Sequence, residues 1–359
     1  MIVLLCLYKY AKNNTLEEYI EIYRRMMRSM LDGYNREINY LRVSITDRCN
    51  LRCNYCMPRE GISQIGHDDI LRYEEILRIV RVAVGMGISK VRITGGEPLV
   101  RRGVVDFISS LASLEGLTDI SLTTNGTLLE TFAAKLFRAG MKRINVSLDS
   151  LNPQKYAYIT RGGDLRAVLA GIAEVHRIGF APIKINTVAI KGFNDDEILD
   201  FAKLSFLKPF QIRFIEFMTI GQAALDPNNQ YLSNTVIREI ISRYYNLEPV
   251  NGKRNTMDGP AQIYRIAESA GEIGFISPLS HKFCHACNRL RLTADGHLRI
   301  CLLSDEEVDL KRPLRDGCSD ADLIGLIKGA ITRKPLQHDI SCDESHRKKC
   351  MTDMSYIGG

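Results

Sequence analysis

Three cysteines lie within eight residues of each other, at Cys49, Cys53 and Cys56. Several thiolates on one short loop can bind one metal ion or one cluster together. A structural zinc ion would need a fourth ligand, whereas a [4Fe–4S] cluster held by three thiolates leaves one iron open to an outside ligand. The C-x3-C-x2-C spacing therefore favours an open iron–sulfur cluster, and a structural zinc loop is the alternative.

A second group of three cysteines occurs late in the chain, at Cys284, Cys287 and Cys301. A turn at Asp295-Gly296 predicts a hairpin that brings Cys301 back toward the other two. Beside the first group, this pattern favours a second open [4Fe–4S] cluster. The alternative is a zinc site in which His281 or His285 is the fourth ligand.

The strand between Cys287 and the hairpin turn alternates polar and apolar residues from Asn288 to Thr293. Successive side chains of a strand point to opposite faces. Arg289, Arg291 and Thr293 are therefore expected to share one face. Outside the two groups, Cys6 and Cys318 are interpreted as ordinary thiols, and the four-residue repeat of His and Cys from 338 to 350 is interpreted as coincidence.

Strand-like and helix-like stretches alternate from residue 40 onward, which predicts a parallel sheet with right-handed crossovers. Six strands are too few for a closed eight-stranded barrel, so we expect an open, partial (β/α)6 TIM-like barrel. The predicted strands are Tyr40–Thr46, Lys90–Thr94, Asp119–Thr124, Arg143–Ser147, Ile183–Ala189 and Gln211–Phe217. The predicted helices are Glu74–Met86, Val104–Leu114, Leu129–Arg138, Leu165–Ile178 and Asp195–Leu204.

Polar and glycine-rich segments follow four of these strands, at Gly95–Pro98, Thr123–Gly126, Ser147–Asp149 and Glu216–Met218. The first cysteine group also follows a strand. Barrel enzymes carry their chemistry at the carboxyl ends of the strands. We therefore expect these segments to surround one mouth and to face the cysteine loop.

Composition limits the class of protein. The 359 residues are 45% hydrophobic and 25% charged, with a formal net charge of +6. We expect no membrane span, no nucleic-acid partner and an anionic small-molecule substrate. Ten cysteines, six of them in two clusters, without a secretory signal indicate metal binding in a reducing cytoplasm.

The chain is expected to divide into three parts. Residues 1–35 form an N-terminal extension with an amphipathic helix at Thr15–Leu31, and a translation start at Met30 is the alternative. Residues 36–220 form the partial barrel. Residues 221–359 form a C-terminal region that carries the second cysteine group and ends in Gly358-Gly359.

The first cysteine motif, with Tyr55 directly before the third cysteine, resembles the signature of radical S-adenosylmethionine (SAM) enzymes. Further segments resemble the GTP-cyclising branch of that superfamily in molybdenum cofactor biosynthesis. These segments are Tyr40–Asn50, Arg92–Leu99, Leu122–Gly126, Phe283–Thr293 and the terminal Gly358-Gly359. The resemblance extends from about residue 31 to the end of the chain.

The resemblance implies a lyase that converts GTP to 3′,8-cyclo-7,8-dihydro-GTP, which a separate cyclic pyranopterin monophosphate synthase then uses. It implies two [4Fe–4S] clusters, SAM, a low-potential electron donor and a homodimer. It assigns Cys49, Cys53 and Cys56 to the SAM cluster and Cys284, Cys287 and Cys301 to the GTP cluster.

The remaining contacts that the resemblance implies fall into two sets. SAM would contact Tyr55, Gly96, Ser147 and Met218. GTP would contact Arg42, Arg92, Thr123, Lys184, Arg289 and Arg291. Guanidinium groups suit the second set, because they bind phosphate oxygens bidentately and the sequence contains no P-loop motif.

Two competing functions are considered. One is another two-cluster radical SAM enzyme, such as a peptide-modifying maturase, although such enzymes usually have a longer and more cysteine-rich C-terminal extension. The other is a non-catalytic module that binds zinc or transfers electrons. No side chain is predicted to act as a catalytic acid or base, since the radical chemistry belongs to the cofactor.

Overall fold

The structure is a computed structural model that describes residues 30–218, 220–221, 230–250, 259–338 and 354–358. The predicted helix at Thr15–Leu31 lies almost entirely outside these residues, as do Cys342, His346 and Cys350.

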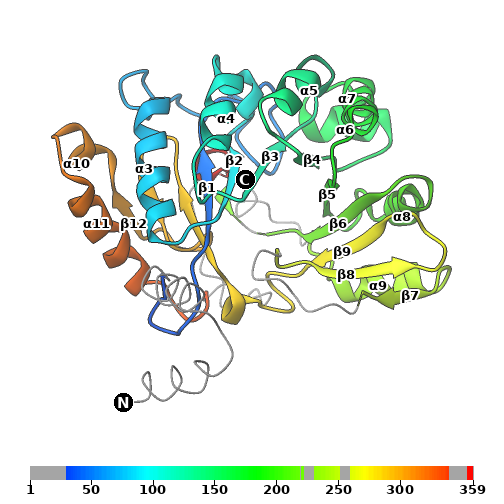
Figure 1. Cartoon of the computed structure of the whole chain (residues 1–359). Coiled ribbons are helices and arrows are strands. Elements are labelled where there is room, and N and C mark those ends of the chain that lie inside the picture. Colours follow the sequence, from blue (N-terminus) through cyan, green and yellow to red (C-terminus); the bar gives the residue numbers. More distant parts are fainter. Residues whose placement is uncertain (1–29, 219, 222–229, 251–258, 339–353, 359) are drawn as a thin grey trace, which may run out of the picture.

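The six predicted strands are present and pair in sequence order, each parallel to the next. They form the central part of a curved sheet that does not close (Figure 1). This confirms the prediction of an open α/β barrel. The strands are β1 (Tyr40–Ser44), β2 (Lys90–Thr94), β3 (Asp119–Thr124), β4 (Arg143–Ser147), β5 (Ile183–Ala189) and β6 (Phe210–Glu216).

Helices connect these strands and cover the outer face of the sheet (Figure 1). Four match predicted helices closely, and the fifth predicted helix begins as a short 3-10 turn at Asp195–Glu197. The helix α6 was not predicted. The helices are α3 (Tyr73–Met86), α4 (Val104–Ala112), α5 (Leu129–Arg138), α6 (Pro153–Thr160), α7 (Leu165–Ile178) and α8 (Ile198–Leu207).

Helix α7 illustrates how the sequence fixes these boundaries. The side chain of Asp164 accepts a hydrogen bond from the backbone N–H of Arg166 at the start of the helix. Gly179 ends it in the left-handed conformation, at φ 99°, which glycine adopts without strain. Leu165, Val168, Ile172 and Val175 bury one face of the helix, whereas Leu169 is 42% exposed.

The C-terminal residues extend the same sheet at both edges. Strand β10 (Arg289–Leu292) pairs in parallel with β1, and β9 (Glu272–Ile276) pairs in parallel with β6. Antiparallel strands continue the sheet beyond β10 at one edge and beyond β9 at the other, which gives twelve strands among the described residues. The other C-terminal elements are α9 (Asn234–Ser242), β7 (Leu247–Pro249), β8 (Gln262–Ile266), β11 (His297–Arg299), β12 (Glu307–Asp309), α10 (Lys311–Arg315), α11 (Asp320–Thr332) and α12 (Met354–Ile357).

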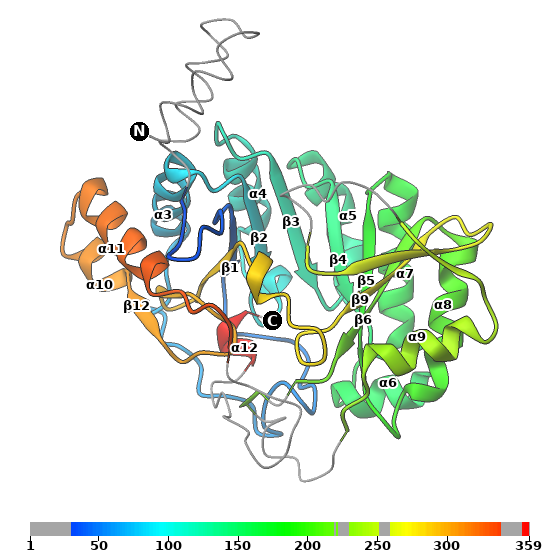
Figure 2. The ribbon, with the colours of Figure 1, turned by 90° about the horizontal axis from the view of Figure 1, so that it is seen from below.

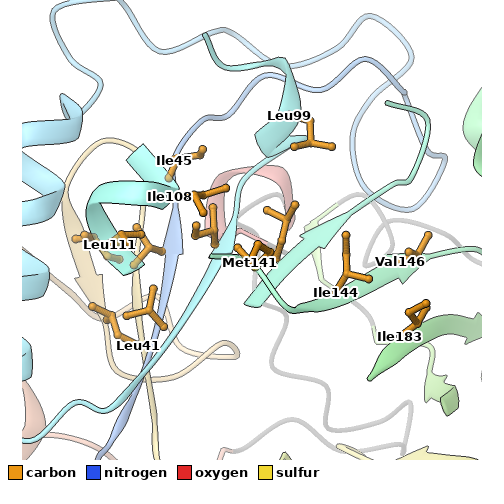
Figure 3. Close-up of a cluster of buried hydrophobic side chains, with 14 of the residues drawn as sticks. Leu41, Ile45, Leu99, Ile108, Leu111, Met141, Ile144, Val146 and Ile183 are labelled. Atoms are coloured by element: carbon orange, nitrogen blue, oxygen red, sulfur yellow. The ribbon is translucent and has the colours of Figure 1, made fainter. Parts of the chain in front are cut away.

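The hydrophobic core lies between the outer face of the sheet and its helices. Leu41, Ile144 and Ile183 from the strands and Ile108 and Leu111 from α4 all belong to this core, and Figure 3 shows Leu41 near Leu111, with Ile144 and Ile183 further along the sheet. All are at most 1% exposed. Burying one such side chain stabilises the fold by roughly 1.5–3 kcal/mol.

The other face of the strands is polar, because strand residues alternate. Arg42 lies between the buried Leu41 and Val43, and Arg92 lies between Val91 and Ile93. The core therefore takes one face of the sheet and leaves the concave face for polar chemistry. No helix of the described residues is long and apolar enough to span a membrane.

Candidate active site

Most of the predicted site residues surround one cavity in the concave face of the sheet. Both cysteine groups line it, together with every predicted SAM contact and five of the six predicted GTP contacts. The lining residues predicted from sequence are Arg42, Cys49, Cys53, Tyr55, Cys56, Arg92, Gly96, Thr123, Ser147, Met218, Cys284, Cys287, Arg289, Arg291 and Cys301.

Lys184 is the predicted GTP contact that is absent from the cavity wall. Its side chain is buried on β5, in register with Asn145 and Gln211 of the neighbouring strands. Burial and the charges of Arg213, Arg143 and Arg92 lower the pKa of Lys184 to about 6. Lys184 lies between the core residues Ile183 and Ile185, so alternation places its side chain on the concave face, among these cations but outside the cavity wall.

The first cysteine loop is attached to the barrel through the residue between its last two cysteines. The Tyr55 hydroxyl donates a hydrogen bond to Asp149 Oδ2 at 2.6 Å, and Asp149 Oδ1 accepts from the backbone N–H of Val188. The Tyr55 ring also meets Phe217 edge to face, with 6.4 Å between ring centroids. The loop is thus held against the ends of β4, β5 and β6.

The glycine-rich segment after β2 holds the start of the same loop. The backbone N–H of Gly96 donates to Thr46 O at 2.7 Å, and that of Glu97 donates to Arg48 O at 2.8 Å. A Cβ atom at position 96 would lie only 2.4 Å from Arg48 O, so this close approach requires glycine.

Glu97 then joins this segment to the end of β3. Its carboxylate accepts hydrogen bonds from Thr124 Oγ1 at 2.8 Å and from the backbone N–H of Asn125 at 2.7 Å. Burial raises the pKa of Glu97 to about 7, although these hydrogen bonds oppose the shift. Asn125 in turn lines the cavity beside Cys49.

The second cysteine group is held by two buried cations. Arg36 Nη1 donates to Cys284 O at 2.7 Å, while its Nε is bound to Asp32 Oδ2 at 2.5 Å. Lys334 Nζ donates to Arg289 O at 2.9 Å and to Ile300 O, next to Cys301. Lys334 also lines the cavity.

The two groups of thiols have different electrostatic surroundings. Burial, together with Cys56 and Asp149, holds the pKa of Cys53 well above the usual thiol value. Burial alone would raise the pKa of Cys287, but the positive charges of Arg289 and Lys334 outweigh this effect. The net result is a pKa lowered to about 6. Cys287 is therefore more ready than Cys53 to supply a thiolate.

No three His, Cys, Asp or Glu side chains of the described residues converge closely enough to bind a single metal ion. A mononuclear zinc site needs such convergence, because all ligands bind the same ion at about 2.0–2.3 Å. A [4Fe–4S] cluster distributes its thiolates over separate irons. The donor sets, each of three cysteine thiols at a cavity wall, fit a cluster.

A row of arginines crosses the concave face between the two cysteine groups. Arg42 of β1 pairs in register with Arg92 of β2 on one side and with Arg291 of β10 on the other. Burial and the charge of Arg289 lower the pKa of Arg291 to about 10. Adjacent cations on a buried surface create a positive potential suited to a polyanion.

Several buried polar atoms around this row have no hydrogen-bond partner among the described residues. They include Tyr40 OH, Thr123 Oγ1, Asn186 Oδ1 and Arg291 Nη1, all on residues that line the cavity. Leaving such a group unpaired typically costs about 1–3 kcal/mol. The cavity is therefore built to receive a polar ligand.

Sequence reasoning missed several residues of the cavity wall. Arg213 lies on β6, between Ile212 and Phe214, and alternation alone could have placed it on the polar face like Arg42. Asp149 is the last residue of Ser147–Asp149, one of the polar segments expected at the mouth of the barrel. Lys334 had no such signal, because it follows α11 and reaches the site only through the tertiary fold.

The C-terminal helix lies inside the curve of the sheet (Figure 2). Ile357 of α12 packs with Ile220 and Leu279, and Met354 lines the cavity. Arg42 Nη2 donates to Gly358 O at 3.2 Å. A Cβ at Gly358 would lie 2.6 Å from Thr94 Oγ1, so the residue after the helix must be glycine to fit against β1 and β2.

Comparison with protein families gives two adjacent matches. Residues 43–205 match the model of the radical SAM superfamily, and residues 210–340 match the model named Molybdenum Cofactor Synthesis C.

Curated relatives match nearly the whole chain. A GTP 3′,8-cyclase from Alkaliphilus oremlandii is 49% identical over 92% of this chain and 100% of its own length. Another from Moorella thermoacetica is 51% identical over 92% of this chain and 100% of its own length.

Among solved structures, Streptococcus suis SuiB bound to S-adenosylmethionine superposes with a TM-score of 0.58 at 15% identity. The match covers 86% of this chain and 72% of SuiB. This likeness concerns the fold alone.

Proposed function

The chain belongs to the GTP 3′,8-cyclase family of radical SAM enzymes, and we propose that it catalyses the first step of molybdenum cofactor biosynthesis. Its two substrates bind at two ends of one cavity. SAM binds at the end formed by Cys49, Cys53 and Cys56. GTP binds at the end formed by Cys284, Cys287 and Cys301. The relatives' shared name favours this activity over the peptide-modifying alternative.

One observation carries the proposal: both cysteine groups line a single cavity with a row of arginines between them. When bound, the first cluster would supply an electron that cleaves SAM, and the resulting radical would begin the cyclisation of GTP to 3′,8-cyclo-7,8-dihydro-GTP. A shared cavity is needed because such a radical must meet GTP without meeting solvent.

The chain's own residues position the reactants. Tyr55, held by Asp149, orients the first cysteine loop, and Gly96 allows the backbone to pass close to it. Ser147 and Met218 are the further SAM contacts that the family suggests. No side chain is assigned a proton transfer.

GTP is held by cations and by the second cluster. Arg42, Arg92 and Arg291 form the row that would bind the triphosphate, whose charge is about −4 near neutral pH. Arg289 contributes beside Cys287 and Thr123 offers its unpaired hydroxyl, while Lys184, outside the cavity wall, would gain a proton when the triphosphate binds. An open iron of the second cluster is suited to the guanine end of the nucleotide.

The test is anaerobic incubation of the reconstituted protein with GTP, SAM and dithionite. The expected products are 5′-deoxyadenosine and the cyclised nucleotide, in comparable amounts. Formation of 5′-deoxyadenosine without any cyclised nucleotide would contradict the assignment of GTP as substrate. The homodimer, the cyclic pyranopterin monophosphate synthase that would use the product and the cytoplasmic location stay predictions.

A further inference from the structure

A second groove lies against the first cysteine loop and is distinct from the active-site cavity. It has a volume of about 980 Å³, and among the described residues it shares only Tyr55 with that cavity. Arg52, Asn54 and Tyr55 of the cysteine loop form part of its wall. Tyr55 thus borders both the cavity and the groove, whereas Arg52 and Asn54 line the groove alone.

The groove is basic. Its described wall contains Arg52, Arg59, Arg161 and Lys191, and it contains no Asp or Glu. Two of the cations brace the cysteine loop, since Arg52 donates to Cys49 O at 2.6 Å and Arg161 donates to Met57 O at 3.0 Å. The exposed side chains of Arg59 and Lys191 form no ion pair with any described residue, so their charge is available to a partner.

Aromatic side chains accompany this charge. Tyr158 of α6 is 68% exposed, and its ring lies 5.9 Å from that of Phe193, which also lines the groove. Tyrosine and arginine are enriched where proteins bind other proteins, because they combine apolar contact area with hydrogen bonding. The groove therefore combines the charge and the contact surface of a protein-binding site.

We propose that this groove docks a small acidic electron-carrier protein that reduces the first cluster. The inference rests on the proposed function, in which that cluster must receive an electron from outside. Electron transfer slows steeply with distance, so a carrier must approach the cysteine loop closely. The groove is the basic, aromatic surface formed by that loop itself.

The electron count of the step is simple. One electron leaves the reduced cofactor of the carrier, for example a flavin hydroquinone that becomes a semiquinone, and converts the cluster from the 2+ to the 1+ state. No proton or ligand needs to cross the wall. Complementary charge would mainly accelerate encounter, and such redox complexes are small and salt-sensitive.

The experiment compares two double variants of the full-length, anaerobically reconstituted protein. In the first, Arg59→Glu and Lys191→Glu reverse two charges of the groove. In the matched control, Arg81→Glu on α3 and Lys328→Glu on α11 change the net charge equally at exposed positions outside the groove. The probe is flavodoxin, reduced for kinetics and oxidised for calorimetric binding.

We expect the groove variant to bind flavodoxin at least tenfold more weakly and to form 5′-deoxyadenosine correspondingly more slowly with flavodoxin as reductant. With dithionite, which needs no docking, its rate should equal that of the wild type. The control variant should match the wild type in both assays. Tyr158→Ala should weaken flavodoxin binding without changing the dithionite rate.

Equal flavodoxin binding by the groove variant and the wild type would overturn the inference, as would an equal loss in the control variant. A wild-type protein that forms no 5′-deoxyadenosine with dithionite would instead refute the proposed function, and the docking inference with it. The dithionite arm therefore separates the two failures.

Discussion

At the scale of single residues, the site depends on cations that the fold holds close together. Arg42, Arg92 and Arg291 are neighbours because their strands are paired in register, not because they are near in sequence. Mutual repulsion and desolvation make such a row unfavourable without a ligand. The fold imposes this free-energy cost, and a bound polyanion such as the triphosphate proposed above would relieve it.

Arg291 offers a direct test of this row. It is 5% exposed, and its Nη1 has no hydrogen-bond partner among the described residues. Arg291→Met should remove a charge-assisted contact worth roughly 1.5–3 kcal/mol, which corresponds to a ten- to hundredfold loss of GTP affinity. Calorimetry on the reconstituted protein measures the loss.

The control for this change is Arg166→Met, because the Arg166 side chain is 89% exposed and lies outside the cavity wall. It should leave GTP affinity unchanged. Both variants should retain their iron and bind SAM like the wild type. Unchanged GTP affinity in Arg291→Met would count against the row as the triphosphate site.

Lys184 predicts a pH dependence of GTP binding. Its pKa of about 6 means that the side chain is neutral at pH 7.5 in the free protein. A bound triphosphate would offset the surrounding cations and raise this pKa, so the complex would hold more protons than the free protein. GTP affinity should therefore rise as the pH falls from about 8 to 6, and the gain should end below 6.

Calorimetry in buffers of different ionisation enthalpy measures the proton uptake directly. The uptake attributable to Lys184 is the number of protons taken up by the wild type minus the number taken up by Lys184→Met. This difference should approach about one proton per GTP near pH 7.5. The difference also cancels the titration of GTP itself. Equal proton uptake by the two proteins would mean that Lys184 does not respond to the triphosphate.

At the scale of elements, the C-terminal helix α12 lies inside the curve of the sheet and forms part of the cavity wall. Gly358 has φ 81° and lies against Thr94 and Ser44, so it is restricted both by its backbone conformation and by its neighbours. Its carbonyl accepts from Arg42, a member of the arginine row. The helix and the row therefore position each other.

Gly358→Ala should displace this wall. A Cβ there would meet Thr94 Oγ1 at 2.6 Å, whereas a Cβ added at Gly317, which has a similar φ of 86°, would meet no atom within 4 Å. Gly317→Ala thus controls for backbone strain alone. We expect Gly358→Ala to lower the yield of cyclised product per 5′-deoxyadenosine several-fold, as measured by chromatography, and Gly317→Ala to leave that ratio unchanged.

An unchanged ratio in Gly358→Ala would show that α12 is only a packed terminus. Deletion of Gly358 and Gly359 provides a second variant with the same expected result. In both, the iron content and SAM binding should equal those of the wild type.

The elements also show how far sequence reasoning reaches. The strands β1 to β6 were predictable because short apolar runs alternate with amphipathic helices, and the cysteine spacing brought out the two groups that line the cavity. Strands β7 and β8 were missed because the first has three residues and the second is only partly buried, and β9 was missed, although its centre is buried, because it does not alternate with a predicted helix. The parallel pairing of β9 with β6 and of β10 with β1 depends on tertiary contacts that no local pattern encodes.

At the scale of the whole molecule, the two cysteine groups belong to distant parts of the chain and are braced by different residues. Asp149 and Tyr55 hold the first group, while Arg36 and Lys334 hold the second. The two clusters should therefore assemble independently of each other.

Replacing Cys284, Cys287 and Cys301 by Ala tests this independence. The iron content should fall from about eight to about four per chain, because each [4Fe–4S] cluster holds four irons. SAM cleavage driven by dithionite should persist, whereas GTP binding and cyclisation should be lost. Replacing Cys49, Cys53 and Cys56 should have the converse effect, with GTP still bound. Loss of all iron in either variant would contradict independent assembly.

The placement of β10 beside β1 has a consequence for synthesis on the ribosome. Asn39 and Asn288, which are hydrogen-bonded next to this strand pair, are 249 residues apart. At a synthesis rate of about 5–20 residues per second, the edge of β1 stays unpaired for roughly 10–50 s before β10 is synthesised. An unpaired strand edge is a template for aggregation. The nascent barrel thus remains open at its first strand until the chain is nearly complete, and chains that terminate after β6 should be recovered as aggregates or bound to chaperones.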